Sequence, residues 1–323
     1  LRSRGLGDVY KRQVLNQGSR KEDTGKGGRP SYDVVMMFKI LVLQRLYNLS
    51  DDQTEYQIND RMSFMRFLGI NLCEKVPDAK TIWKFKNDLA ETETVDKLFC
   101  MFDEHLENKG LISHKGTIVD ATFVDAPRQR NSRDENKKIK NGVIPEEWEK
   151  PENKSKLAQK DIDADWTKKN GERHFGYKDH VKCDADSKLI TNYSVTSASV
   201  HDSQRCLVFI GQEDEVLYAD SAYSGKPIAL ALPENCKNQI CEKGYRNSPL
   251  TSEQEMNNRR KSRIRCRIEQ IFGFMTGAMH GITIRSIGIT RAWMNIGITN
   301  LVYNFCRYSY CLLYTSPSPR DRS

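Results

Sequence analysis

The sequence of 323 residues contains no long hydrophobic run. A membrane-spanning helix needs roughly 18 consecutive apolar residues, and no stretch of the chain approaches that length. No signal peptide is visible in the sequence either. These absences exclude an integral helical membrane protein, and we expect no membrane partner.

Cysteine pairs at metal-binding spacing are also missing. Cys311 belongs to a C-terminal tail described below, and the other eight cysteines are scattered, with no C-x-x-C pair and no histidine at zinc spacing. Only Cys236 and Cys241 lie close together, which leaves a shared zinc site as an alternative. We expect reduced, packed thiols in a cytosolic protein.

The chain has no strong excess of positive or negative charge once its two terminal segments, residues 1–13 and 311–323, are left out of the count. Residues 3–13 translate a DNA that resembles a tagmentation sequencing adapter, and residues 311–321 translate its reverse complement. We therefore expect residues 1–13 and 311–323 to be adapter-derived and to have no defined packing, and the native part to be truncated at both ends. The tails contribute +3 and +1 to the formal net charge of +8, so +4 remains. Because this is only mildly basic, the distribution of charge must indicate any polyanionic partner.

The first native block, residues 14–110, is predicted to be helical from about Pro30. Its apolar residues recur every three to four positions, and Ser50 with Gln53 forms a capping-box pattern. Pro77 and Asp78 then precede a helix start that carries three lysines, Lys80, Lys84 and Lys86. We predict that these helices include a helix-turn-helix whose lysines face DNA phosphates. A basic, solvated helix face explains the same pattern equally well.

Strand patterns begin after residue 111, and two of the strands are followed by an acid. Asp120 follows an apolar run at residues 117–119, and Asp220 follows another at 216–219. Residues 128–171 are polar and contain two prolines, so we expect a long, partly ordered insertion. The remaining elements are predicted as follows: strands at 174–181, 189–195 and 239–242, a turn at 184–187, and helices from about 202, 226 and 290 and around 269.

The predicted order of strands and helices can bring three acidic side chains together at one site. Two carboxylates at strand ends and a third, Glu269, on a late helix can share a pair of hard cations. Ligands that are all oxygen suit Mg²⁺ or Mn²⁺, and two such ions roughly 4 Å apart can clamp a phosphodiester. A single acid at a strand end is more often a turn former, and Asp125 is a rival to Asp120, although Ala126 and Pro127 end the strand there. We predict that Asp120, Asp220 and Glu269 are the catalytic ligands of two Mg²⁺ (or Mn²⁺) ions.

The helix of Glu269 follows a dense run of positive charge, with six cations in residues 259–267. We predict contacts to the DNA backbone from its arginines, Arg259, Arg260, Arg263, Arg265 and Arg267. Arg265 lies four residues before Glu269 and shares its face, so it can pair with that carboxylate or reach a phosphate.

Other polar residues near these positions leave their roles open. His201 lacks a suitably spaced nucleophile, and Asp202 beside it is expected to cap a helix. His174 and His180 are expected to be structural or to face phosphate. Tyr223 can pack on a sugar or shield the site.

The ordered motifs resemble bacterial DDE transposases of the insertion-sequence-five kind. The stretches that carry this resemblance are Gly28-Arg29-Pro30, residues 76–81, TIVDATFVDA at 117–126, residues 166–169 with 174–178, residues 200–203, YADSAYSG at 218–225 and RIEQIFG at 267–273. Relatives with the longer signature around the glutamate have Tyr and Lys where this chain has Ser262 and Thr276.

The resemblance implies an α/β architecture in two parts. A helical DNA-binding region at 14–110 is expected to precede a ribonuclease-H-like catalytic domain at 111–310, with a mixed sheet and flanking helices. The implied activity is cleavage at the inverted-repeat ends of an insertion sequence and joining of the 3′-hydroxyls to target DNA. We expect a homodimer on double-stranded DNA in the bacterial cytoplasm, associated with the nucleoid. A nuclease of the same fold without strand transfer and a non-catalytic DNA-binding remnant are the alternatives.

Overall fold

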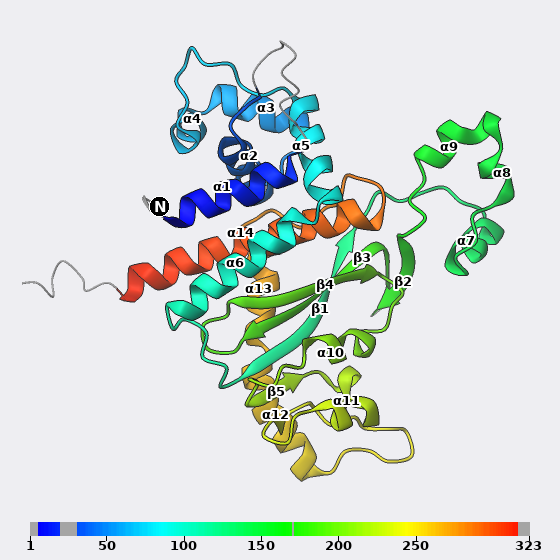
Figure 1. The fold of residues 1–323 in the computed structure, drawn as a ribbon. Helices are drawn as coiled ribbons and strands as arrows, with labels where there is room; N and C mark the ends of the chain where they lie inside the picture. Colours follow the sequence, from blue (N-terminus) through cyan, green and yellow to red (C-terminus); the bar gives the residue numbers. More distant parts are fainter. Residues whose placement is uncertain (1–5, 20–30, 170, 316–323) are drawn as a thin grey trace, which may run out of the picture.

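The computed structural model describes residues 6–19, 31–169 and 171–315, and a mixed sheet with helices around it forms its centre (Figure 1). The strands are ordered β2 (Asp165–Lys169), β3 (Glu172–Asp184), β1 (Thr117–Asp125), β5 (Val216–Ala219) and β6 (Lys237–Asn238), and β4 (Ile190–Ser197) pairs with the rest of β3. β1 is antiparallel to β3 and parallel to β5. The predicted mixed sheet is therefore confirmed, and β1 lies at its centre.

The predicted N-terminal helices are present, and their starts are set by capping side chains. Ser50 and Gln53 form the predicted capping box, and the Asp78 carboxylate accepts from the Thr81 N–H at 2.7 Å. The helices before the sheet are α1 (Leu6–Gly18), α2 (Val34–Leu46), α3 (Asp51–Asp60), α4 (Met62–Leu68), α5 (Ala79–Glu91) and α6 (Thr94–Asn108).

The last helix, α14 (Ile289–Thr315), joins the N-terminal helices to the sheet (Figure 1). It packs against β4 on one side and against α2, α5 and α6 on the other. Ile40 of α2, Ile82 of α5, Leu189 beside β4 and Ile298 of α14 belong to one buried hydrophobic cluster. The helical region and the sheet therefore share a core.

A second buried cluster covers the opposite face of β1 and β5. Val119 of β1 and Leu217 of β5 pack there with residues of α10 (Ser203–Phe209) and α11 (Lys226–Ala231). Ile118, next to Val119, belongs to the first cluster, because successive side chains of a strand point to opposite faces. The central strands are therefore buried on both faces, as is usual for parallel pairs.

The polar insertion has more structure than its composition predicts. It contains α7 (Arg133–Lys140), α8 (Glu146–Glu149), the 3₁₀ helix η1 (Pro151–Asn153), α9 (Lys154–Ala158) and the unpredicted strand β2. Figure 1 shows its helices set apart from the sheet as a lobe. Trp148 is fully buried there, and its ring N–H donates to Glu135 at 2.8 Å. One aromatic residue thus organises a segment that has few apolar residues.

Two predicted elements have different boundaries. β1 continues to Asp125, so Asp120 lies inside the strand and not at its end, because the antiparallel pairing with β3 continues through Asp125. The last strand, β6, lies at Lys237–Asn238 and not at 239–242.

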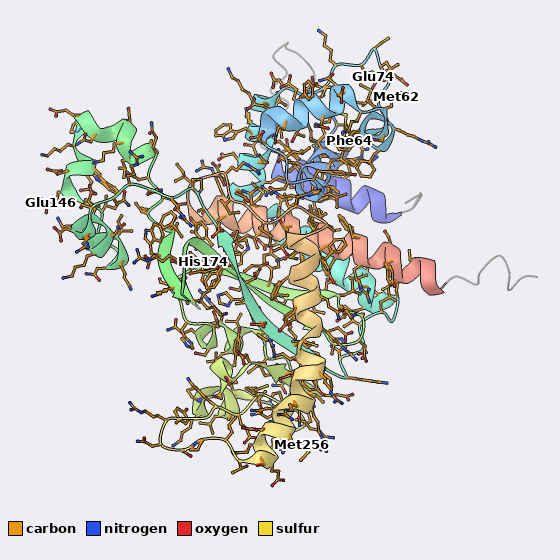
Figure 2. All side chains as sticks on the ribbon, turned by 180° about the vertical axis from the view of Figure 1, so that it is seen from behind. Met62, Phe64, Glu74, Glu146, His174 and Met256 are labelled. Atoms are coloured by element: carbon orange, nitrogen blue, oxygen red, sulfur yellow. The ribbon has the colours of Figure 1, made fainter. Side chains whose placement is uncertain are left out.

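The helix expected around Glu269 is two helices, α12 (Ser252–Arg265) and α13 (Arg267–Thr276), which meet at Cys266. The Glu269 N–H bonds to the Cys266 carbonyl at 3.1 Å, a tighter turn than in an α-helix. Figure 2 shows the two following one another from the end near Met256 toward α14.

The expectation that the two tails have no defined packing is wrong for their described parts. α1 begins at Leu6, and Arg12 pairs with Asp33 at 2.6 Å, while α14 continues to Thr315. Once Val14 and Leu15 are buried, extending their helix outward costs little per residue. Residues 1–5 and 316–323 lie outside the described residues. Among the helices of the described ranges, none is long and apolar enough to cross a bilayer.

Candidate active site

The parallel pairing of β1 with β5 places the first two predicted acids side by side. Val119 is in register with Ala219, and Asp120 and Asp220 are the next residues of the two strands. The parallel ladder ends at that point, because β5 stops at Ala219 while β1 continues. Both carboxylates therefore stand where the sheet opens between two strands, a common place for ligand sites in α/β proteins.

Asp120 is the buried member of the group. Its side chain is 17% exposed, one oxygen accepts from the Ala121 N–H at 2.8 Å, and the other accepts from Arg265 Nη1 at 3.0 Å. Burial raises the pKa of Asp120, and Asp220 adds to the rise, while the Ala121 N–H and Arg265 act against it. An anion in this position is costly unless cations accompany it.

Asp220 is exposed and fixed through its own turn. Its carboxylate accepts from the Ser221 N–H at 2.6 Å and caps the 3₁₀ helix η2 (Ser221–Tyr223). Tyr223, at the end of this turn, is 1% exposed and packs in the second cluster with Val119. The buried Tyr223 ring therefore anchors the turn of Asp220 to the core. Because the ring is not accessible, the alternative that it packs on a sugar is excluded.

Glu269 reaches the same place from α13, which packs against β1. Ile268 and Ile271 are fully buried, which leaves Glu269 on the outer side of the helix with its side chain 57% exposed. Its carboxylate accepts from Arg265 Nη2 at 2.6 Å. Arg265 thus touches Asp120 with one nitrogen and Glu269 with the other.

A single guanidinium therefore joins two of the three predicted acids. Although burial opposes it, Asp120, Glu269 and Asp220 together raise the pKa of Arg265. Two acids contact this cation, the charge of Asp220 acts on it as well, and all the potential ligand atoms of the three acids are carboxylate oxygens. Such a donor set fits hard divalent ions of the Mg²⁺ or Mn²⁺ type.

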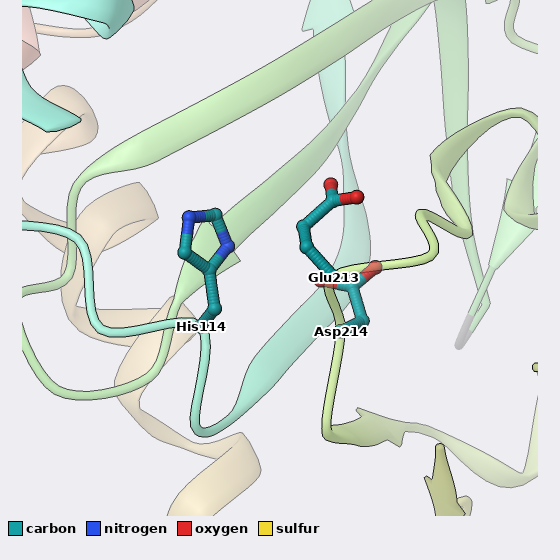
Figure 3. Close-up of side chains that lie close together, drawn as sticks. All are labelled: His114, Glu213 and Asp214. Carbon is teal, nitrogen blue, oxygen red and sulfur yellow. The ribbon is translucent and has the colours of Figure 1, made fainter. Parts of the chain in front are cut away.

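A second acidic cluster lies near the other end of β1 and was not predicted from the sequence. His114, Glu213 and Asp214 lie close enough to share one ion (Figure 3). Lys182 already supplies a positive charge there, because its Nζ donates to Asp214 at 2.9 Å and lies 3.6 Å from Glu213. Thr117 and the Gly211 N–H also donate to Asp214. The buried carboxylate is therefore satisfied by the protein itself and does not require a metal.

The predicted DNA-binding lysines of α5 do not all face solvent. Lys80 and Lys84 are exposed, and so is Trp83 between them. Lys86 is half-buried and pairs with Asp51, and burial lowers its pKa. Lys86 is thus turned inward, because Asp51 at the start of α3 faces it.

The predicted arginines divide into two groups. Arg259, Arg260 and Arg263 are exposed along α12. Arg265 belongs to the acid cluster, and Arg267 is turned toward the β3–β4 turn, where it donates to the Ala185 carbonyl at 2.7 Å and to Asp186 at 3.0 Å. The exposed surface formed by these arginines is therefore smaller than the sequence predicts and lies on α12.

The polar residues whose roles the sequence left open have structural partners. The His174 ring stacks on Phe123, with centroids 4.3 Å apart, and lies 3.7 Å from the exposed Asp125. His180 is buried against the Thr196 hydroxyl, and burial lowers its pKa to about 4. Asp202 does not cap α10 with its side chain, because its carboxylate accepts from Lys178 at 2.8 Å.

The remaining histidine and the close cysteine pair are equally accounted for. His201 bonds to Ser203 within its own turn at 2.8 Å. Cys236 and Cys241 are buried free thiols, and the Cys241 sulfur lies 3.8 Å from the Ser262 hydroxyl. None of these residues adds a ligand to the acid cluster.

Comparisons with known proteins identify the family. Residues 112–305 match the family model described as a transposase DDE domain, and residues 9–88 match a transposase domain described as DUF772. A solved structure of a piggyBac transposase synaptic complex with hairpin DNA aligns with a TM-score of 0.45 and 11% identity, over 97% of this chain and 74% of that chain. The mixed sheet with its flanking helices is the ribonuclease-H-like fold that a DDE domain implies. Because the first match covers more than half of the sequence, the chain belongs to the transposase DDE domain family.

Proposed function

We propose that the protein is a bacterial transposase of the insertion-sequence-five kind that cleaves the inverted-repeat ends of its element and joins their 3′-hydroxyls to target DNA. The observation that carries this proposal is the guanidinium of Arg265, which bridges Asp120 and Glu269 beside the strand end that delivers Asp220. Asp120, Asp220 and Glu269 form the catalytic group in this proposal.

These three residues would hold two Mg²⁺ (or Mn²⁺) ions. When bound, the ions would stabilise charge on the scissile phosphate and activate the attacking water or hydroxyl. Asp120 is held rigidly inside β1, whereas Glu269 is exposed on a helix and can adjust to the ligand. The protein thus offers two carboxylates held by their local backbone, Asp120 and Asp220, and one adaptable carboxylate, Glu269.

Arg265 must release its carboxylates for the ions to bind. The preceding part of the same helix carries the exposed Arg259, Arg260 and Arg263, which form the basic surface that we propose for the DNA backbone. Lys80 and Lys84 of α5 provide a second contact with the nucleic acid. We further propose a homodimer, in which each copy processes one end of the element in the nucleoid of its host.

The test uses DNA carrying the terminal repeats that flank the gene, with a labelled strand and a supercoiled target. The parent protein should nick the repeat ends in Mg²⁺ and yield joined products, whereas Glu269→Gln should bind the same DNA without nicking it. Cleavage without joined products would show a nuclease instead, and binding without cleavage by the parent would show a DNA-binding remnant. Either of the last two results would overturn the proposal.

A further inference from the structure

A cavity of about 80 Å³ lies where the N-terminal helices meet the start of α14. Its walls come from α2, α3, α5, the segment before α14 and the first turns of α14 itself, and Figure 1 shows α2 and α5 lying against that helix. Roughly 10–15 Å³ of such space is enough for one water molecule. The cavity can therefore hold a small polyatomic anion together with water.

Its charged lining is strongly unbalanced. The side chains that matter here are Arg45, Lys86, Arg285, Arg291 and the single acid Asp51. Asp51 is already engaged by Lys86 and by the Gln44 amide. Three guanidinium groups therefore share the cavity without a carboxylate of their own within the described ranges.

The bonds that these arginines do make are to neutral oxygens. Arg45 donates to the Asn295 side chain. Arg285 donates to the side chain and backbone of Asn48 at 2.9 and 3.1 Å, and Arg291 donates to Asn87 and to the Ile287 carbonyl at 2.8 and 3.1 Å. A guanidinium has five N–H donors, so each arginine retains donors that these bonds leave available for a ligand.

Burial makes this arrangement costly for Arg45 in particular. Arg45 is only 8% exposed, and burial together with the nearby Arg285 lowers its pKa to about 10. Removing a charge from water without an opposite charge is unfavourable. A bound anion would relieve that cost for all three arginines.

The cavity also connects to a surface suited to nucleic acid. Trp83 lines it and is 53% exposed, and Asn87, one helical turn further on, binds Arg291. The exposed Lys80 and Lys84 flank Trp83 on the outer side of α5. Residues three or four apart share a helix face, so this face leads from solvent into the cavity.

We propose that the cavity binds a phosphate group and that this group belongs to the backbone of bound DNA. Arg45, Arg285 and Arg291 donate to its oxygens, and Trp83 packs against the adjoining nucleotide. Only the assignment to DNA rests on the function proposed above. The site lies between the N-terminal helices and α14, which packs on the sheet. A DNA phosphate held there would fix the position of the helical region relative to the DNA that is bound at the sheet.

The first arm of the test uses inorganic phosphate and the full chain. Titration calorimetry at constant ionic strength, set by chloride, should detect one phosphate site. The double variant Arg285→Gln/Arg291→Gln leaves the buried Arg45 in place and should bind phosphate about tenfold more weakly or worse, since it loses two charged hydrogen bonds. Arg66→Gln, an exposed arginine on α4, is the control and should bind as the parent does.

The second arm identifies the source of the phosphate with a 30-base-pair duplex of arbitrary sequence. Phosphate should compete with this duplex for the parent protein, and the double variant should show a shallower dependence of log affinity on log salt, by about 0.9 for each phosphate that is no longer neutralised. Phosphate binding without competition would overturn the assignment to DNA. Equal phosphate affinity of parent and double variant, with circular dichroism showing both folded, would overturn the site itself. Because neither arm requires cleavage, failure of the proposed catalytic function is seen separately in the nicking assay.

Discussion

At the scale of single residues, the most informative contact is the one between Arg265 and two acids far apart in sequence. Asp120 and Glu269 lie on different elements, and each accepts a charge-assisted hydrogen bond from the same guanidinium, at 3.0 and 2.6 Å. Such bonds are stronger than neutral ones. The carboxylates therefore already have a cation, and a metal ion must compete with it.

Replacing Arg265 should consequently strengthen metal binding in the absence of DNA. We expect Arg265→Gln to bind Mn²⁺ about tenfold more tightly than the parent or better, because a competing charge-assisted bond of roughly 1.5–3 kcal/mol is gone. Arg263→Gln removes the same charge two residues earlier on α12, where the side chain is exposed, and should leave the Mn²⁺ affinity unchanged. Electron paramagnetic resonance of free Mn²⁺ measures both, and weaker binding by Arg265→Gln would contradict the role given to this residue.

Asp179 provides a residue-scale prediction about pH. It is buried on β3 beside Asn300 of α14, its second oxygen has no hydrogen-bond partner among the described residues, and burial raises its pKa to about 8. In the unfolded chain an aspartate ionises near pH 4, so unfolding between about pH 4 and 8 releases a proton. The contribution of Asp179 to the free energy of unfolding must therefore fall as the pH rises through this window.

Asp179→Asn removes this dependence while keeping the bond to Asn300 possible. The melting temperature of the variant minus that of the parent should grow by several degrees from pH 5 to pH 8. Asp134→Asn, exposed in the insertion, should give a difference that does not change with pH. Differential scanning calorimetry at the two pH values measures both differences in melting temperature. A difference for Asp179→Asn that does not change with pH would contradict the prediction, because the Asp179 carboxyl would then already be ionised in the folded protein at pH 5.

At the scale of secondary-structure elements, the exposed arginines lie on α12, and the proposed catalytic residue Glu269 lies on α13. Arg259, Arg260 and Arg263 are exposed on the first, whereas Glu269 lies in the first turn of the second. The break between the two helices at Cys266 would therefore separate the two proposed functions. DNA binding and cleavage should therefore be separable by substitutions on adjacent helices.

Replacing Arg259, Arg260 and Arg263 together with Ala tests this separation. Binding should weaken, and the slope of log affinity against log salt should fall by roughly 0.9 for each phosphate that these arginines neutralise in the parent. Glu269→Gln should keep the parental slope and lose nicking. Filter binding across a salt series, beside a Mg²⁺-dependent nicking assay, measures both, and a parental slope in the triple variant would remove α12 from the DNA interface.

Most elements could be predicted from local sequence, since caps and hydrophobic periods are local signals. Ser50, Asp78 and the runs before Asp120 and Asp220 indicate helices and strands close to where they lie. The differences arise where tertiary partners decide the outcome. β1 continues past Asp120 because β3 pairs with it, and the insertion is ordered around Trp148, which no periodic pattern marks.

The candidate site was predictable in its acids and less so in its cations. The sequence allows Arg265 to pair with Glu269, four residues away, but its bond to Asp120 depends on how α13 packs on β1. Lys86 and Arg267 were expected to face DNA, yet each is engaged by an aspartate from another element. A run of basic residues in the sequence shows how many cations are present. It does not show which of their side chains will be paired with acids inside the folded protein.

At the scale of the whole molecule, α14 makes one body of the helical region and the sheet. Its two sides pack on α2, α5 and α6 and on β4, and the buried cluster runs through all of them without interruption. The sequence suggests two parts, because the periodicity changes after residue 110, but it does not reveal that a C-terminal helix lies between them. Such long-range packing has no local signature.

This shared core predicts one cooperative unfolding transition for the chain. Far-ultraviolet circular dichroism, which follows the helices, and tryptophan fluorescence should give coincident curves in urea. A fragment of residues 111–310 should not fold alone. It lacks the N-terminal helices, so the apolar side of α14 that packs against Ile40 of α2 and Ile82 of α5 would be exposed to water. Two separated transitions would contradict the single core.

The central claim is that Asp120, Asp220 and Glu269 are the ligands of the catalytic ions. The most direct measurement is an anomalous difference map from Mn²⁺-containing crystals of the protein bound to DNA. We predict two peaks roughly 4 Å apart among these carboxylates, with Arg265 moved away from Asp120. A peak at His114, Glu213 and Asp214, with none between Asp120 and Glu269, would contradict the claim.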